Sequence, residues 1–137
     1  MADVEFLDLS GEIREDSRGF SLFPWQDRVQ APRDLLRTFH LISILPGQSR
    51  GHHAHPGYRE CLLTFHGAGV FLWEPRPGEA QERLLTGNRT LVRIPPGIPH
   101  ALRNPGPEIL YLLAWRERAE TGPEEPETEP HPLSPGG

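Results

Sequence analysis

The segment Gly47-Gln-Ser-Arg-Gly-His-His-Ala-His-Pro-Gly-Tyr-Arg-Glu60 combines a histidine pair, a Pro-Gly turn and a carboxylate within fourteen residues. On an extended strand, residues two apart share a face, so His53 and His55 point to the same side. His52 then lies on the opposite face, and we expect it at the surface or at an interface. The Pro-Gly pair predicts a turn, after which Glu60 opens the next strand and can return to the same pocket.

A second histidine follows a rigid turn further along the chain, in Pro95-Pro-Gly-Ile-Pro-His100-Ala-Leu-Arg-Asn104. Together, His53, His55, Glu60 and His100 would form a donor set suited to a divalent transition metal such as Fe, Mn, Ni, Zn, Co or Cu. Ligand type alone does not choose among these metals. Four protein ligands would leave one or two coordination positions for water or substrate.

The rest of the sequence favours an all-β fold. Pro and Gly recur roughly every eight to twelve residues and separate short apolar or alternating runs, a spacing typical of a sandwich or barrel. Many short strands leave sheet edges, which a jelly roll or a closed barrel hides. A helical turn is expected over 33–38. The expected strands are 4–9, 20–23, 37–45, 52–55, 60–65, 70–73, 83–85, 91–94, 99–103 and 109–115.

Composition excludes several classes of protein. The single cysteine, Cys61, rules out an intrachain disulfide framework, and we expect it to be a small buried hydrophobe. All 14 basic residues are arginines, so Schiff-base and P-loop lysine chemistry are excluded. No apolar run reaches the roughly 20 residues of a membrane helix. With Asp3 and Glu5 at the N-terminus, no signal peptide is expected, and we predict a cytoplasmic protein with no membrane partner.

Charge divides the chain into two parts. Residues 1–118 hold equal numbers of acids and arginines, and the net charge of −5 comes from 119–137. A neutral body offers no electrostatic footprint for nucleic acid. We predict one domain over 1–118 and a disordered acidic, Pro-rich tail over 119–137, because this tail has too little apolar surface to fold. The alternative is an interaction tail or a segment that docks on a partner subunit.

The two histidine-containing stretches resemble a known family. The first matches the first cupin motif, G(x)5HxH(x)3-4E(x)6G, and the second resembles the second cupin motif, PxGxxHxxxN. The resemblance covers roughly residues 39–115 and is to small single-domain cupins. It implies a cupin double-stranded β-helix, or jelly roll barrel, with an N-terminal strand extension and a metal inside the barrel mouth. The matching residues are Gly47, His53, His55, Glu60 and Gly67 in the first motif and Pro95, Gly97, His100 and Asn104 in the second.

A second resemblance points to sugar-modifying cupins. Asp16-Ser-Arg-Gly-Phe20 and Arg50-Gly-His-His-Ala-His55 resemble segments of the nucleotide-sugar 3,4-ketoisomerases, which share their fold with dTDP-4-keto sugar 3,5-epimerases. In those ketoisomerases the two matching histidines act as acid/base groups without a metal. This chain has Glu60 where they tend to carry Gln, and Pro99 where they tend to carry Trp. It therefore keeps the metal-ligand quartet that they lack.

These observations predict a metal-binding enzyme, a sugar or keto-sugar isomerase or epimerase acting on a small polar substrate. Tyr58, Tyr111 or His40 would serve as the acid/base group, and Arg50 would bind a phosphate or carboxylate. For His40, a role in the core or the pocket wall is the alternative. An Fe(II)-dependent dioxygenase and a non-catalytic small-molecule-binding or sensor cupin remain open. The resemblance also implies a homodimer that pairs through the strand at 4–9.

Overall fold

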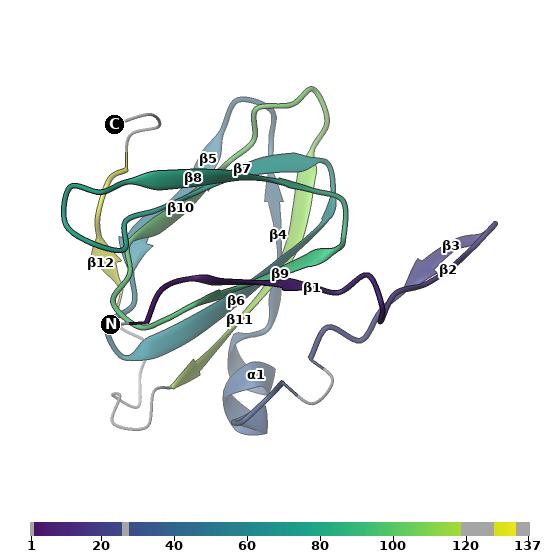
Figure 1. The fold of residues 1–137 in the computed structure, drawn as a ribbon, viewed down its shortest axis with the longest axis horizontal. Coiled ribbons are helices and arrows are strands. Elements are labelled where there is room, and N and C mark those ends of the chain that lie inside the picture. The colour runs from purple at the N-terminus through teal and green to yellow at the C-terminus, as the bar shows by residue number, and fades with distance from the viewer. Residues whose placement is uncertain (1, 26–27, 119–127, 134–137) are drawn as a thin grey trace.

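Two five-stranded antiparallel sheets form a jelly roll, as expected from the sequence (Figure 1). The computed structural model describes residues 2–25, 28–118 and 128–133. The first sheet has the order β1 (Glu5–Asp8), β9 (Thr90–Ile94), β6 (Tyr58–His66), β11 (Leu110–Arg118) and β4 (His40–Ile44). The second has the order β12 (Glu129–Pro130), β5 (Ser49–Ala54), β10 (His100–Arg103), β7 (Ala68–Trp73) and β8 (Gln81–Thr86).

The first sheet is apolar on both faces, and β6 shows why. Leu62 points between the two sheets, into a core that also contains Phe71 and Leu112. The neighbouring Leu63 points outward and packs with Trp115 and other residues under the N-terminal part of the chain. Because side chains alternate along a strand, a strand covered on both faces reads as a continuous apolar run. Glu60 shares the inner face with Leu62, so the fold places a carboxylate inside the barrel.

A short helix precedes the first sheet's edge strand. The expected helical turn is α1 (Pro32–Thr38), and the strand expected from residue 37 begins only at His40. Pro32 suits the first turn of a helix, where the missing amide donor costs nothing. The Thr38 hydroxyl accepts a hydrogen bond from the Arg116 amide at 2.7 Å and so ties the end of α1 to β11. None of the helical structure in the described ranges has the length and apolar character that a membrane crossing requires.

Two segments differ from the sequence-based expectations. The hairpin of β2 (Arg14–Asp16) and β3 (Gly19–Ser21) extends away from the two sheets (Figure 1), and β2 was missed because its three residues are charged and exposed. Part of the tail expected to be disordered, residues 128–133, lies on the barrel, where β12 pairs with β5. Backbone pairing and one buried leucine, Leu133, hold it there. Residues 119–127 and 134–137 lie outside the described residues.

Asn104 joins the end of β10 to β4 and should be a stability determinant. Its buried side-chain amide donates to the carbonyls of Ile44 and Glu108, both at 2.8 Å, and accepts from the Gly106 amide at 2.9 Å. Replacing it with Ala (Asn104→Ala) leaves these backbone groups without their partners, which should cost about 2–4 kcal/mol of unfolding free energy. Urea unfolding measures the loss, with Gln81→Ala, an exposed amide on β8, as the control. Equal stability of the two variants would contradict this role.

Candidate metal centre

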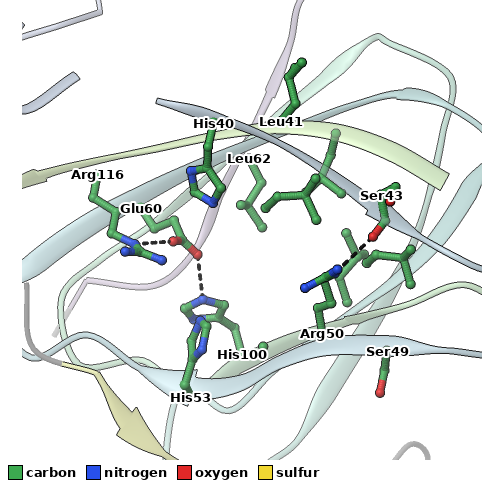
Figure 2. Close-up of a pocket in the computed structure, with 15 residues that line it drawn as sticks. His40, Leu41, Ser43, Ser49, Arg50, His53, Glu60, Leu62, His100 and Arg116 are labelled. Atoms are coloured by element: carbon green, nitrogen blue, oxygen red, sulfur yellow. Dashed lines mark hydrogen bonds and ion pairs between the residues drawn. The ribbon is translucent and has the colours of Figure 1, made fainter. Parts of the chain in front are cut away.

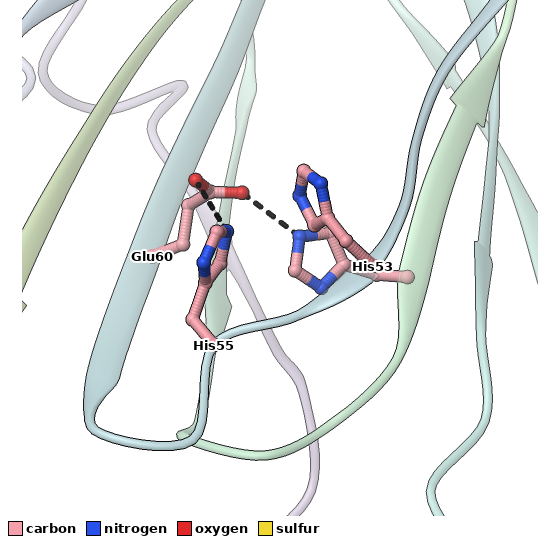
Figure 3. Close-up of side chains that lie close together, drawn as sticks. His53, His55 and Glu60 are labelled. Carbon is pink, nitrogen blue, oxygen red and sulfur yellow. Dashed lines mark hydrogen bonds and ion pairs between the residues drawn. The ribbon is translucent and has the colours of Figure 1, made fainter. Parts of the chain in front are cut away.

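The two cupin-like motifs meet between the sheets in what we call the His/Glu cluster: His53, His55, Glu60 and His100. Figure 2 labels His53, Glu60 and His100, and Figure 3 labels His53, His55 and Glu60. One candidate ligand atom from each of the four residues lies within 4.8 Å of all the others. His53 is half-buried, and the other three side chains are buried. The Glu60 carboxylate lies 2.9 Å from Nε2 of His100 and 3.4 Å from Nε2 of His55. The spacing along the chain therefore brings together four side chains from β5, β6, β10 and the turn after β5.

A bulge in β5 shapes the histidine pair. His53 lies opposite His100 and Gly51 lies opposite Ala101, so His52 is the extra residue. His52 has a φ of 54°, which is uncommon for a residue other than glycine. Gly51 has a φ of 97°, and a Cβ there would lie 3.0 Å from the Ala101 Cα, so this position requires glycine. The bulge turns His52 away from the His/Glu cluster and toward residues 128–133, where its Nδ1 accepts a hydrogen bond from the Leu133 amide.

The hydrogen bonding of His100 fits a cation at the cluster. Its Nδ1 lies 2.9 Å from the carbonyl oxygen of Ile98. A carbonyl only accepts, so Nδ1 carries the proton, and in a neutral ring Nε2 then presents its lone pair to the Glu60 carboxylate. Two acceptors facing each other need a proton or a metal ion between them. A metal-bound histidine typically has this arrangement, with its other nitrogen donating to a carbonyl or carboxylate.

The electrostatics of the cluster favour the protonation states that metal ligands need. Burial raises the pKa of Glu60, but the neighbouring His100 and His55 imidazoles outweigh this effect and hold the pKa well below its usual value. Burial, together with the neighbouring His100 and His55, lowers the pKa of His53 to about 4. At neutral pH the carboxylate is therefore charged and the His53 imidazole is neutral, as coordination requires.

The His/Glu cluster opens into a cavity of about 680 Å³ (Figure 2). His40, from β4, extends over the part of the cavity that contains Glu60. Arg50 lies apart from the cluster and donates from Nε to the Ser43 carbonyl at 3.0 Å. A volume of this size is typical of small-molecule sites. The cavity is thus lined by the His40 imidazole near the candidate metal centre and by the Arg50 guanidinium away from it.

The structure separates the predicted acid/base residues. His40 lines the cavity, whereas Tyr58 and Tyr111 are not among its lining residues. Tyr58 is buried at the start of β6. Tyr111 is partly exposed on the outer face of β11, where it stacks on Phe65 with ring centroids 6.1 Å apart. We therefore retain only His40 as an acid/base candidate.

Two interactions with the cluster were not anticipated from the sequence. Arg116 on β11 donates from Nε to Glu60 at 2.8 Å, because it lies directly opposite Glu60 in the β11–β6 pairing. The strand expected over 109–115 stopped one residue short of it. Thr128 contacts Nδ1 of His55 through its hydroxyl, at 3.1 Å. Cys61 lies on the other face of β6, and burial raises its pKa to about 12, which fits the expected buried hydrophobe.

Comparison with known structures assigns the architecture. QdtA from Thermoanaerobacterium thermosaccharolyticum, a sugar 3,4-ketoisomerase solved in complex with TDP, superposes with a TM-score of 0.64. The match has 16% identity and covers 89% of this chain and 87% of that one. A 3,4-ketoisomerase from Helicobacter canadensis gives the same TM-score at 20% identity, covering 89% and 90%. The chain has the cupin fold.

A third similar structure is larger than this cupin chain. The capsular polysaccharide assembling protein CapF from Staphylococcus aureus matches with a TM-score of 0.61 and 25% identity over 69% of this chain. The match covers only 28% of CapF, so the matched part of this chain spans little more than a quarter of CapF. No protein-family model matches the sequence, and no curated protein is significantly similar to it.

Removing one member of the cluster should abolish most of the metal binding. His53→Ala takes away one of four ligands and should weaken zinc affinity by about 100-fold or more, since even partners outside the ligand shell are worth about 10- to 100-fold. Isothermal titration calorimetry of protein freed of metal by chelation measures the loss. His66→Ala, which removes an exposed imidazole, is the control. Unchanged affinity in His53→Ala would show that zinc binds elsewhere.

The low pKa of His53 should make the metal-free fold sensitive to acid. The unfolded chain takes up this proton near pH 6.5 and the folded chain only near pH 4, so folding stability decreases as pH falls through that interval. His53→Ala removes this contribution. As pH falls from 6.5 to 4, the native protein should therefore lose more unfolding free energy than the His53→Ala variant does. Thermal unfolding at several pH values tests this, and parallel curves for the two proteins would contradict it.

Proposed function

We propose that this protein is a metal-dependent isomerase or epimerase acting on a sugar or keto-sugar. The observation that carries the proposal is the His/Glu cluster opening into a small-molecule cavity with His40 on its wall. The similarity to two sugar 3,4-ketoisomerases and to a capsular polysaccharide assembling protein supports a carbohydrate substrate. The TDP bound to QdtA supports a sugar linked to a nucleotide.

The four cluster residues would hold the metal. A divalent ion at His53, His55, Glu60 and His100 would act as a Lewis acid toward a substrate carbonyl. Glu60 contributes the negative charge, and Arg116 fixes one of its oxygens. His100 is fixed by the Ile98 carbonyl. The protein thus presents its ligands from several strands that are already paired and packed.

His40 is the proposed acid/base residue. Its Nδ1 lies 2.7 Å from the Thr38 carbonyl oxygen and must carry the proton, so Nε2 of the neutral ring has a lone pair. Nε2 would take a proton from the carbon beside the sugar carbonyl, and the electron pair left behind would move onto the carbonyl oxygen. Return of the proton to the same face of that carbon restores its configuration, and delivery of a proton to the opposite face inverts it. If the carbon proton instead goes to the former carbonyl carbon and the proton of the neighbouring hydroxyl goes to the former carbonyl oxygen, the carbonyl moves to the adjacent carbon of the sugar.

Arg50 would bind an anionic group of the substrate. Its Nε donates a hydrogen bond to the Ser43 carbonyl. This bond holds the guanidinium at the cavity wall, away from the His/Glu cluster (Figure 2). Arginine forms paired hydrogen bonds with phosphates and carboxylates. A nucleotide-linked sugar would therefore extend between Arg50 and the reacting carbon near the metal.

Solvent exchange tests this chemistry. The zinc-, manganese- or iron-reconstituted protein is incubated with nucleotide-linked 4-keto sugars in D2O, and mass spectrometry follows deuterium uptake at carbon. His40→Asn should slow the exchange by about 100-fold or more, the usual contribution of an acid/base group, without loss of metal. His66→Asn is the control. Exchange that survives full chelation would contradict the metal-dependent proposal.

Two further outcomes would select the alternatives. Oxygen consumption that requires Fe(II) and is absent with zinc would indicate a dioxygenase. Tight binding of a metabolite without deuterium exchange or oxygen consumption would indicate a binding or sensor cupin.

We also propose a homodimer that forms at β1. This strand pairs with β9 of its own chain and lies at the edge of its sheet, where strands of a second copy could add. Size-exclusion chromatography with light scattering measures the assembly, and a monomer at micromolar concentration would contradict it.

A further inference from the structure

The segment 128–133 contacts the strand that carries the candidate ligand His53 and leads directly to His55. Its strand β12 pairs with β5, with Glu129 opposite Ala54 and Pro130 opposite His53. In the described sheet, β12 is the edge strand, and β5 lies between it and β10. This C-terminal segment, residues 128–133, therefore covers the backbone of β5 at His53 and Ala54, on the side away from β10. Figure 1 shows β12 beside the barrel at this edge.

Three contacts hold the C-terminal segment in place. The amide of Leu133 donates to Nδ1 of His52 at 3.0 Å, and the amide of His131 donates to the His52 carbonyl. The Leu133 side chain is buried against Leu72 and Ala101. The left-handed backbone of His52, the extra residue of the bulge, is what presents both acceptors to this segment. Such a conformation costs of order 1–3 kcal/mol and persists only where surrounding contacts compensate for it.

The segment also contacts the candidate metal centre. The Thr128 hydroxyl lies 3.1 Å from Nδ1 of His55, while Nε2 of the same ring faces Glu60. When Nε2 binds a metal, Nδ1 must carry the proton and needs an acceptor. A hydroxyl can accept or donate, so it can pair with Nδ1 in either tautomer of the ring.

From these contacts we infer that Thr128 is a positioning residue for the metal centre, and that docking of the C-terminal segment through His52 and Leu133 sets the orientation and metal affinity of His55. This inference rests on the proposed metal centre. Residues 128–133, which composition assigns to a tail, would then have a direct role at the His/Glu cluster.

The test measures zinc affinity and the Co(II) absorption spectrum of the full-length chain with single substitutions. Thr128→Val keeps the shape but removes the hydroxyl, and should weaken zinc binding about 10- to 100-fold and alter the Co(II) bands. Thr128→Ser should restore both. Leu133→Asp, which places a charge in the apolar contact, should weaken zinc binding without touching His55. Glu129→Gln, an exposed change in the same segment, is the control.

A second measurement separates this inference from the proposed function. In metal-free protein, long-range ¹H–¹⁵N spectra report the ring nitrogens of His55, and Thr128→Val should shift its Nδ1 resonance while leaving that of His100 in place. If the native protein binds no metal, the proposed function fails, but this shift would still support the positioning contact. An unchanged His55 resonance, or native zinc affinity in Thr128→Val or Leu133→Asp, would overturn the inference.

Discussion

The interior of this barrel is organised by one buried negative charge, the carboxylate of Glu60. A buried charge is costly unless charged or hydrogen-bonding partners compensate it, and removing one partner leaves the penalty uncompensated. Here Arg116 on β11 provides a charged partner. The imidazoles of His100 on β10 and His55 after β5 also face the carboxylate, and they compensate its charge when a proton or a metal ion lies between the groups. The two sheets therefore meet at Glu60 through polar contacts as well as through their apolar core. A divalent metal would provide the same compensation with a stronger charge.

The cavity wall is linked to elements outside the barrel. The Thr38 carbonyl at the end of α1 fixes the tautomer of His40, and the Thr38 hydroxyl bonds to the Arg116 backbone beside the His/Glu cluster. α1 is in turn held by Glu117, which accepts from the amides of Gln30 and Ala31. Contacts on the outer face of the first sheet thus help to position His40 and Arg116, which line the cavity on its inner face. The helix and the C-terminal segment approach the site from different sides, one at His40 and the other at His55.

The sequence was sufficient to predict those residues of the site whose positions depend on strands and turns close to them in the chain. Strand alternation and the Pro-Gly turns are enough to bring His53, His55 and Glu60 to one side, and a rigid turn sets His100 at the start of its strand. Arg116 and Thr128 could not be found this way, because their proximity depends on strand pairing across 56 and 73 residues. Tyr111 shows the limit of assigning faces, since a shift of one residue along a strand moves a side chain to the opposite face. The short strand β12 was missed because the prediction of disorder used the average composition of residues 119–137. The contact of this segment with the barrel depends on a few residues, such as Leu133.

We expect the four side chains of the His/Glu cluster to bind one divalent metal ion together. The most direct test of this expectation is a crystal structure of the zinc-bound protein with anomalous diffraction data collected on both sides of the zinc absorption edge. One strong anomalous peak per chain is expected, within about 2.0–2.2 Å of a nitrogen from each of His53, His55 and His100 and an oxygen of Glu60. A cluster without such a peak, with Glu60 still paired only to its histidines and Arg116, would contradict this expectation.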